Sequence, residues 1–157
     1  MIIGHDLHDG VGDKSGMSKF MQGNSKRILV PGGAGYIGSH TCVELLNRGY
    51  TPVIVDSMAA IDRICQITGA NDVPVIEADI RDTDAMICAL REHECEAVIH
   101  FAGLKAVGES TVNPLDYYSN NVQGSLSLLD AMKQAGVGHI VFSSSATVYG
   151  TPVSLPY

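Results

Sequence analysis

A glycine-rich stretch of this chain has the spacing of a loop that binds a diphosphate. Glycines stand at positions 32, 35 and 38, directly after a short aliphatic run. Such glycines let backbone amides approach phosphate oxygens, and a helix that starts there offers free N–H groups and the positive end of its dipole. Asp56 stands at the end of the next apolar run. In dinucleotide-binding folds, a carboxylate at this position accepts hydrogen bonds from the adenosine ribose. Glycine spacing alone also marks ordinary turns, but this order of strand, loop, helix, strand and acid predicts a dinucleotide site.

Two neighbouring residues refine this prediction. The negative charge of Asp56 favours NAD over NADP, because a carboxylate beside the ribose repels a 2′-phosphate. Pro31 separates the first strand from the glycine loop. It has no N–H, so we expect it to remove one possible ladder or phosphate donor and to weaken binding.

The elements that must position these residues follow from hydrophobic periodicity. Short β-branched runs alternate with segments of helical period, which indicates βαβ units and a parallel sheet buried on both faces. The predicted fold class is α/β, a Rossmann-like doubly wound parallel sheet. The predicted strands are 27–30, 51–55, 73–77, 97–101 and 139–143, and the predicted helices are 36–48, 59–68, 83–93 and 114–135.

The last of these helices has the clearest signals. Asn113 is a candidate N-cap, Pro114 suits the first helical position, and Gly136 suits a C-terminal stop, as Gly49 does for the first helix. We expect its apolar face to carry Leu115, Tyr118, Val122, Leu126 and Leu129.

Composition limits the classes of protein that this chain can represent. It has 157 residues, of which 45% are hydrophobic and 17% charged, as in a single packed globular domain. A net charge of −7 repels a phosphate backbone, so nucleic acid is not an expected partner. No apolar run has the length of a membrane span, and no secretory signal precedes the domain. We therefore expect a cytoplasmic protein without a membrane partner.

Residues 1–26 differ from the rest of the chain. They are rich in glycine and aspartate without an apolar period, which predicts a flexible tail ahead of a domain at 27–157. His5 and His8 could hold a metal ion, but polar tails usually carry such residues for solvation, so no metal is predicted. The four cysteines fit neither a zinc knuckle nor a disulfide framework and are expected to be reduced and mostly buried.

From position 27 to 157 the chain resembles the extended short-chain dehydrogenase/reductase family and, within it, the UDP-glucose 4-epimerase group. Four motifs carry the resemblance: GGAGYIGSHTC at 32–42, VIHFAGLKAVGES at 98–110, PLDYYSNNV at 114–122 and FSSSATVYG at 142–150. It implies an NAD-dependent isomerase that interconverts UDP-glucose and UDP-galactose through a 4-keto intermediate with transient reduction of NAD. It also implies a UDP-sugar substrate and, for full-length members, a homodimer.

The resemblance also assigns roles to residues. Gly32, Gly35, Tyr36, Ile37 and Gly38 would lie against the pyrophosphate, with Asp56 on the adenosine ribose. Asp79 and Ile80 would flank the adenine, and Phe101, Ala102, Gly103, Leu104 and Lys105 would line the nicotinamide side. Asn120 would contact the cofactor, and Ser145 would be both a cofactor contact and the catalytic serine.

Some of these residues have plainer interpretations. Lys105 could be a solvated surface lysine and Asn120 and Asn121 exposed helix residues. His100, inside an apolar strand, is interpreted as a hydrogen-bonded core residue. Ser145 is singled out from its neighbours by the resemblance alone.

One part of the family pattern is absent. The base in this family is a tyrosine whose pKa is lowered by a lysine four residues later, and none of the six tyrosines has a lysine there. We therefore expect the catalytic helix and the sugar-nucleotide domain to lie outside this chain, and the chain alone to be inactive. It could be a fragment of a longer enzyme, a cofactor-binding module without catalysis, or a decayed copy. Another nucleotide-sugar epimerase or dehydratase is a further alternative.

Overall fold

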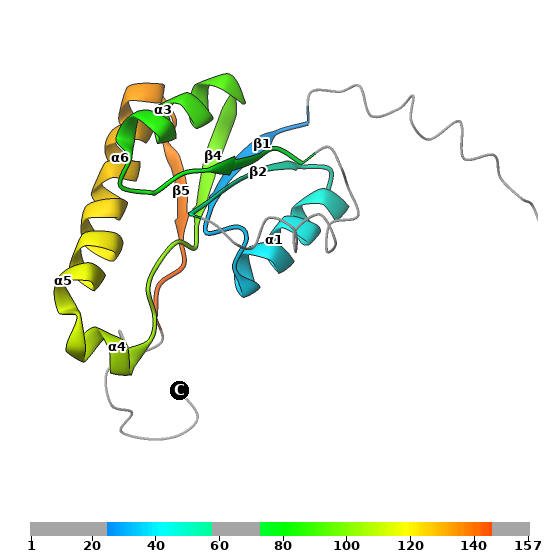
Figure 1. The fold of residues 1–157 in the computed structure, drawn as a ribbon. Coiled ribbons are helices and arrows are strands. Elements are labelled where there is room, and N and C mark those ends of the chain that lie inside the picture. The colour runs from blue at the N-terminus through cyan, green and yellow to red at the C-terminus, as the bar shows by residue number, and fades with distance from the viewer. Residues whose placement is uncertain (1–24, 58–72, 146–157) are drawn as a thin grey trace, which may run out of the picture.

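The predicted parallel sheet is present. The fold comes from a computed structural model that describes residues 25–57 and 73–145. Within them five parallel strands form one sheet in the order β3-β2-β1-β4-β5 (Figure 1). The strands are β1 (Arg27–Pro31), β2 (Thr51–Asp56), β3 (Val75–Glu77), β4 (Cys95–His100) and β5 (His139–Phe142). The chain moves outward from β1 to β3 and then returns to β4 on the other side, so the strand order reverses beside β1. Ligands of such sheets bind at that reversal, outside the carboxyl ends of the strands.

Helices cover both faces of the sheet, as Figure 1 shows. On one face α1 (Tyr36–Asn47) buries Cys42 against Ile28, Val30 and Ile54. On the other, α3 (Thr83–Glu92) and α6 (Gly124–Ala135) cover Leu29 and its neighbours. Successive β1 side chains alternate between these two apolar clusters because strand side chains point to opposite faces. This two-sided burial fixes the carboxyl ends of the central strands in place.

The single helix predicted for 114–135 is wrong in detail. The structure has α5 (Pro114–Tyr117), a π-helical turn η2 (Tyr118–Gln123) and then α6. Pro114 occupies a first-turn position as predicted, but the Asn113 side chain makes no capping hydrogen bond. Gly136 does end α6 in the left-handed conformation, at φ 77°. A further helix, α4 (Val107–Val112), was not predicted, because six residues with a glycine and two hydroxyl side chains carry little helical period.

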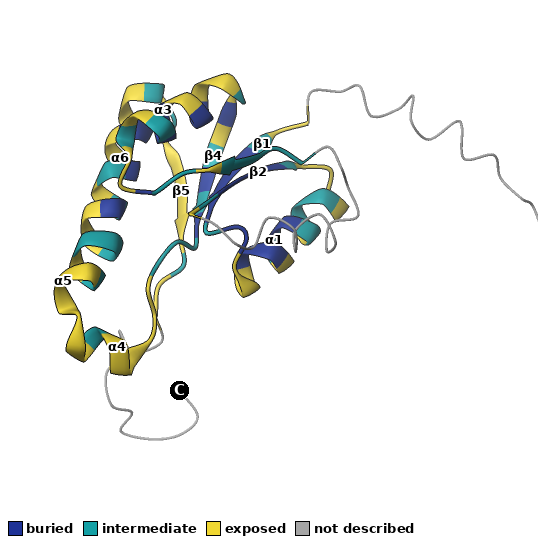
Figure 2. Cartoon of the chain, viewed as in Figure 1, coloured by how far each residue is buried: buried dark blue, intermediate teal, exposed yellow. Residues whose placement is uncertain are grey.

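The apolar face expected to pack this helix against the core is exposed in the described chain. Residues on the opposite side are buried instead, including Leu128, Ala131 and Met132. In Figure 2 the ribbon of α6 accordingly alternates between buried and exposed positions. Strand β5 is exposed along its whole length. The expected face, which is exposed throughout, consists of Leu115, Tyr118, Val122, Leu126 and Leu129.

Several predictions fall on residues that the structure does not describe. These are the helix 59–68, residues 1–24 of the predicted tail with His5 and His8, and the segment 146–157. Among described cysteines Cys42 and Cys95 are buried and Cys88 is exposed, and burial raises the pKa of the Cys42 thiol to about 12. No helix in the described ranges is long and apolar enough to cross a membrane.

Candidate functional site

The glycine loop after β1 is packed too closely for side chains. Gly32 has φ +78°, and a Cβ placed on it would lie 2.7 Å from the carbonyl carbon of Phe101 and closer still to Ala102 N. A Cβ on Gly38 would collide with Gly32 O and would lie 2.7 Å from Gly33 Cα. The loop backbone is thus held between the end of β4 and the start of α1, where a side chain at position 32 or 38 would not fit.

The first turn of α1 has open backbone donors. Its N-cap is Gly35, which has no side chain to accept from the turn, and the first intrahelical hydrogen bond runs from Ser39 N to Gly35 O (2.9 Å). The amides before Ser39 therefore lack intrahelical partners, as at every helix start. Tyr36 and Ile37 of this turn line a cavity of about 290 Å³, and Lys105 lines the same cavity. Amides and a lysine ammonium around one cavity suit an anion such as a diphosphate.

Pro31 does not interrupt the central strand. Its carbonyl oxygen accepts from both Phe101 N (2.8 Å) and Ala102 N (2.9 Å), and the next amide, Gly32 N, donates to Val55 O (2.8 Å). The missing N–H therefore removes one donor, while the strand pairing continues on both sides of it.

Asp56 lies where the sequence placed it, at the carboxyl end of β2. Its Oδ2 accepts from Ala34 N in the glycine loop (3.0 Å), and its Oδ1 accepts from Ser57 N (2.8 Å). The half-buried carboxylate lines a cavity of about 260 Å³ together with Gly32, Asp79 and Asn120. Each carboxylate oxygen has further lone pairs, so Asp56 can accept hydroxyl donors from a ribose in that cavity.

Asp79 and Ile80 follow β3 and line the same cavity. The Asp79 carboxylate accepts from the backbone N–H (2.8 Å) and the guanidinium Nε (2.9 Å) of Arg81. These hydrogen bonds lower the pKa of the Asp79 carboxyl and keep it ionised. The Ile80 side chain packs against Gly124 of α6. This packing requires a glycine, because a Cβ on residue 124 would lie 2.6 Å from the Ile80 side chain. Gly124 supports a cavity residue without lining the cavity itself, and nothing local in the sequence distinguishes it.

An asparagine pair holds the loop that follows β4. Asn121 Oδ1 accepts from Leu104 N (2.8 Å), and Asn121 Nδ2 donates to Leu104 O (2.9 Å). Asn120 donates to Asn121 Oδ1 (2.9 Å) and lines the 260 Å³ cavity. Asn121 is thus a half-buried helical residue whose amide is bonded to the loop, not one whose side chain only meets solvent. The π turn η2, which directs both amides toward the loop, has no signature in the sequence.

His100 is a buried, hydrogen-bonded core residue, as predicted. Ser125 Oγ donates to Asn121 O (2.6 Å) and has one proton, so it accepts from His100 Nε2 (3.1 Å). The ring is neutral with its proton on Nε2, and among the described residues Nδ1 has no partner. Burial lowers the pKa of His100, and the charge of Lys105 lowers it further.

This lowered pKa predicts that the protein loses stability as the pH falls. The unfolded state binds a proton on His100 near its ordinary pKa of 6.5, whereas the folded state resists protonation. Stability from this source is complete above pH 6.5 and is lost as the pH falls toward the folded pKa. Between pH 7.5 and 5 we expect the urea midpoint to fall less in His100→Gln than in the unmodified chain. The exposed His139→Gln control should keep the full slope, and equal slopes in all three proteins would contradict the assignment.

The predicted site residues all line one of three cavities at this edge of the sheet. The third, of about 530 Å³, is lined by Ile37, Lys105 and Ser145 among others. Phe101 and Gly103 line all three cavities and so join them. The arrangement therefore brings Ser145 from the end of β5 and Lys105 from the end of β4 to one cavity. The glycine cradle, the helix start and Asp56 fit a dinucleotide laid across the carboxyl ends of the strands.

Sheet order, glycine cradle and acid together define a dinucleotide-binding protein of the Rossmann type. The model of the NAD dependent epimerase/dehydratase family matches residues 28–156, and the chain belongs to this family. Within the described residues, no group of three or more His, Cys, Asp or Glu side chains is placed to hold a metal ion.

Curated relatives of this chain are UDP-glucose 4-epimerases. That of Bacillus subtilis is 57% identical over 134 residues, which are 82% of this chain and 39% of the relative. That of Klebsiella pneumoniae is 53% identical over 135 residues, which are 83% of this chain and 97% of the relative. The Neisseria gonorrhoeae relative is 53% identical, with 40% of its length covered. The chain thus spans about two fifths of the length of two of these three relatives.

Solved structures of UDP-glucose 4-epimerases from two other organisms share the fold of this chain. The UDP-glucose 4-epimerase of Stenotrophomonas maltophila, with bound NAD and formylated UDP-arabinopyranose, is 51% identical with a TM-score of 0.78, over 84% of this chain and 40% of that chain. The Bifidobacterium longum enzyme, in complex with NAD⁺ and UDP, is 49% identical with a TM-score of 0.77, over 84% of this chain and 41% of that chain.

Proposed function

We propose that this chain is the NAD-binding, N-terminal part of a UDP-glucose 4-epimerase. The observation that carries the proposal is the convergence of the glycine cradle, Asp56, Asp79 and Lys105 on joined cavities at one sheet edge. It is supported by relatives of that name at 53–57% identity and by solved structures that hold NAD. The whole protein would interconvert UDP-glucose and UDP-galactose through a 4-keto sugar. Residues 27–157 would be its NAD-binding domain, preceded by a tail at 1–26.

In this proposal each part of the site has a separate task. The amides at the start of α1 hold the pyrophosphate, Asp56 accepts from the adenosine ribose, and Asp79 with Ile80 holds the adenine. Lys105 donates to the nicotinamide ribose or phosphate, and the Asn120 amide contacts the cofactor from η2. Ser145 donates a hydrogen bond to the reacting oxygen of the sugar. NAD, when bound, supplies the hydride acceptor and donor for carbon 4 of that sugar.

The proposal extends to assembly and location. We assign the full-length protein to a homodimer in the cytoplasm, with a UDP-sugar as its small-molecule partner. Exposed apolar side chains on α5, η2 and α6, from Leu115 to Leu129, support a contact surface between copies. Sedimentation of a complete reading frame as a monomer would count against the dimer.

Two other functions remain distinguishable from this one. A related nucleotide-sugar enzyme is less well supported, because a dTDP-glucose 4,6-dehydratase from Streptomyces venezuelae is only 31% identical over 83% of this chain. A cofactor-binding module without catalysis would share the cradle and Asp56, so the structure fits it equally. A nucleotide sequence that continues past codon 157 into a Tyr-x-x-x-Lys motif would decide for the enzyme.

The direct test uses the purified 157-residue chain. Isothermal titration with NAD should show binding, because the pyrophosphate, ribose and adenine contacts all lie within the described residues. Incubation with UDP-galactose should give negligible turnover, because no tyrosine of this chain precedes a lysine at the required spacing. Absence of NAD binding to a folded chain would contradict the cofactor site. Turnover at the rate of complete relatives would contradict the expected absence of the catalytic base.

A further inference from the structure

A single arginine holds the acid at the adenine end of the cavity. Arg81 donates through Nε to Asp79 Oδ1 (2.9 Å) and Oδ2 (3.1 Å) and through Nη2 to Oδ2. The Arg81 backbone N–H also donates to Asp79 Oδ1 (2.8 Å). A guanidinium that grips both carboxylate oxygens fixes the plane of the group as well as its position.

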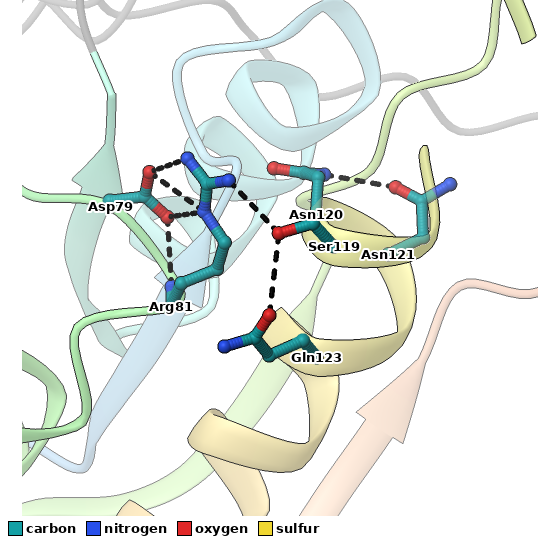
Figure 3. Close-up of polar contacts among 6 residues, drawn as sticks. All are labelled: Asp79, Arg81, Ser119, Asn120, Asn121 and Gln123. Carbon is teal, nitrogen blue, oxygen red and sulfur yellow. Dashed lines mark hydrogen bonds and ion pairs between the residues drawn. The ribbon is translucent and has the colours of Figure 1, made fainter. Parts of the chain in front are cut away.

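The same arginine ties this acid to the helix on the other side of the cavity. Arg81 Nη1 donates to Ser119 Oγ (3.1 Å), and Ser119 Oγ donates to Gln123 Oε1 (3.3 Å) (Figure 3). Asp79 follows β3, whereas Ser119 and Gln123 belong to η2, the turn that also carries Asn120. The carboxylate is therefore braced from two elements that are distant in the sequence.

We propose that Arg81 is a positioning residue that fixes Asp79 so that the pocket selects a 6-amino purine over a 6-oxo purine. The inference rests on the proposed function, in which Asp79 flanks the adenine of NAD. An ionised carboxylate accepts from the exocyclic N–H of adenine, and it repels the carbonyl oxygen that replaces it in hypoxanthine. A freely rotating carboxylate turns away from that oxygen and returns to solvent. A carboxylate that is held at both oxygens cannot turn away from the 6-oxygen of hypoxanthine. The repulsion between them therefore persists, and the pocket binds adenine more tightly than hypoxanthine.

Charge gives a second reason for this arrangement. The chain carries a net charge of −7, and both Asp56 and Asp79 line the cavity that would hold an anionic cofactor. Arg81 offsets the charge of Asp79, and because its Nε is shared between the two oxygens, one lone pair of Oδ2 stays available to the base. Asp79 thereby serves as an acceptor while adding little net negative charge to a cavity that would hold part of an anionic cofactor.

The test compares NAD with nicotinamide hypoxanthine dinucleotide, which differs only at position 6 of the purine. Dissociation constants of both are measured by titration calorimetry for the unmodified chain, Arg81→Gln and the control Arg91→Gln. Arg91 donates to Gln134 O on α6 and lines none of the three site cavities. The unmodified chain should prefer NAD by roughly tenfold to a hundredfold, the range of one hydrogen bond to a charged group. Arg81→Gln should reduce this ratio at least about threefold, and Arg91→Gln should leave it unchanged.

The ratio separates positioning from a general structural role. A change that only loosens the fold weakens both dinucleotides equally and leaves the ratio constant, and that result in Arg81→Gln overturns the inference. If Arg81→Gln does not fold, Ser119→Ala decides, because it removes the link between the guanidinium and η2 together with one exposed hydrogen bond to Gln123. A lower ratio in Ser119→Ala supports the inference and an unchanged ratio overturns it. Failure of the unmodified chain to bind either dinucleotide refutes the proposed function itself, whereas equal binding of both refutes only the selectivity.

Discussion

Gly32→Ala is expected to weaken NAD binding by this chain severely. Position 32 has φ +78°, which an alanine adopts at a cost of about 1–3 kcal/mol. The added methyl would also lie 2.7 Å from the carbonyl carbon of Phe101, which is backbone and cannot rotate away. The loop must therefore move from the end of β4, and this displaces the amides that face the pyrophosphate. We expect NAD affinity to fall at least about a hundredfold, as measured by titration calorimetry.

The chain offers a matched control for this substitution. Gly108 lies in α4, and a Cβ placed there meets no atom within 4 Å. Gly108→Ala should leave NAD affinity unchanged and should favour the helix by about 0.5–1 kcal/mol. Circular dichroism of both variants establishes whether each is folded. Retention of full NAD affinity by a folded Gly32→Ala would show that the cradle around Gly32 is not the pyrophosphate site.

The sheet and most of the site follow from local sequence patterns. Buried parallel strands have continuous apolar runs, and the carboxyl ends of adjacent strands lie at one sheet edge, so the sequence alone predicts that Asp56 lies beside the glycine loop. Periodicity also identified an amphipathic segment after Pro114. It did not show which face of that segment meets the core, because Leu126 and Leu128 are equally apolar but only Leu128 is buried.

The remaining features depend on tertiary contacts that no local pattern encodes. Asn121 acts on Leu104, 17 residues earlier, and Arg81 reaches Ser119, 38 residues later. Both contacts require the π turn η2, whose extra residue per turn changes the face on which each side chain lies. The absence of a side chain at Gly124 matters only because Ile80 packs there. Sequence reasoning therefore finds the groups that contact a ligand more readily than the groups that hold them.

Asp56→Asn is expected to reverse much of the preference for NAD over NADP. The asparagine Oδ1 can still accept from Ala34 N, so the glycine loop keeps its link to β2. The substitution removes the negative charge and replaces one acceptor with an N–H donor. NAD affinity should fall about tenfold with the loss of a charged acceptor for the ribose hydroxyls. NADP affinity should rise, because its 2′-phosphate no longer meets a carboxylate and gains a donor.

The ratio of the two dissociation constants, measured by competition against NADH fluorescence, tests this directly. Glu92→Gln removes the same charge at the exposed end of α3 and should leave the ratio unchanged. A general effect of net charge would move the ratio equally in both variants, since each reduces the total from −7 to −6. If only Asp56→Asn changes the ratio of the two dissociation constants, the 2′-position of the bound ribose lies beside the Asp56 carboxylate. An unchanged ratio in Asp56→Asn would instead leave the link between the glycine loop and β2 as the only role of Asp56, and the preference for NAD would need another source.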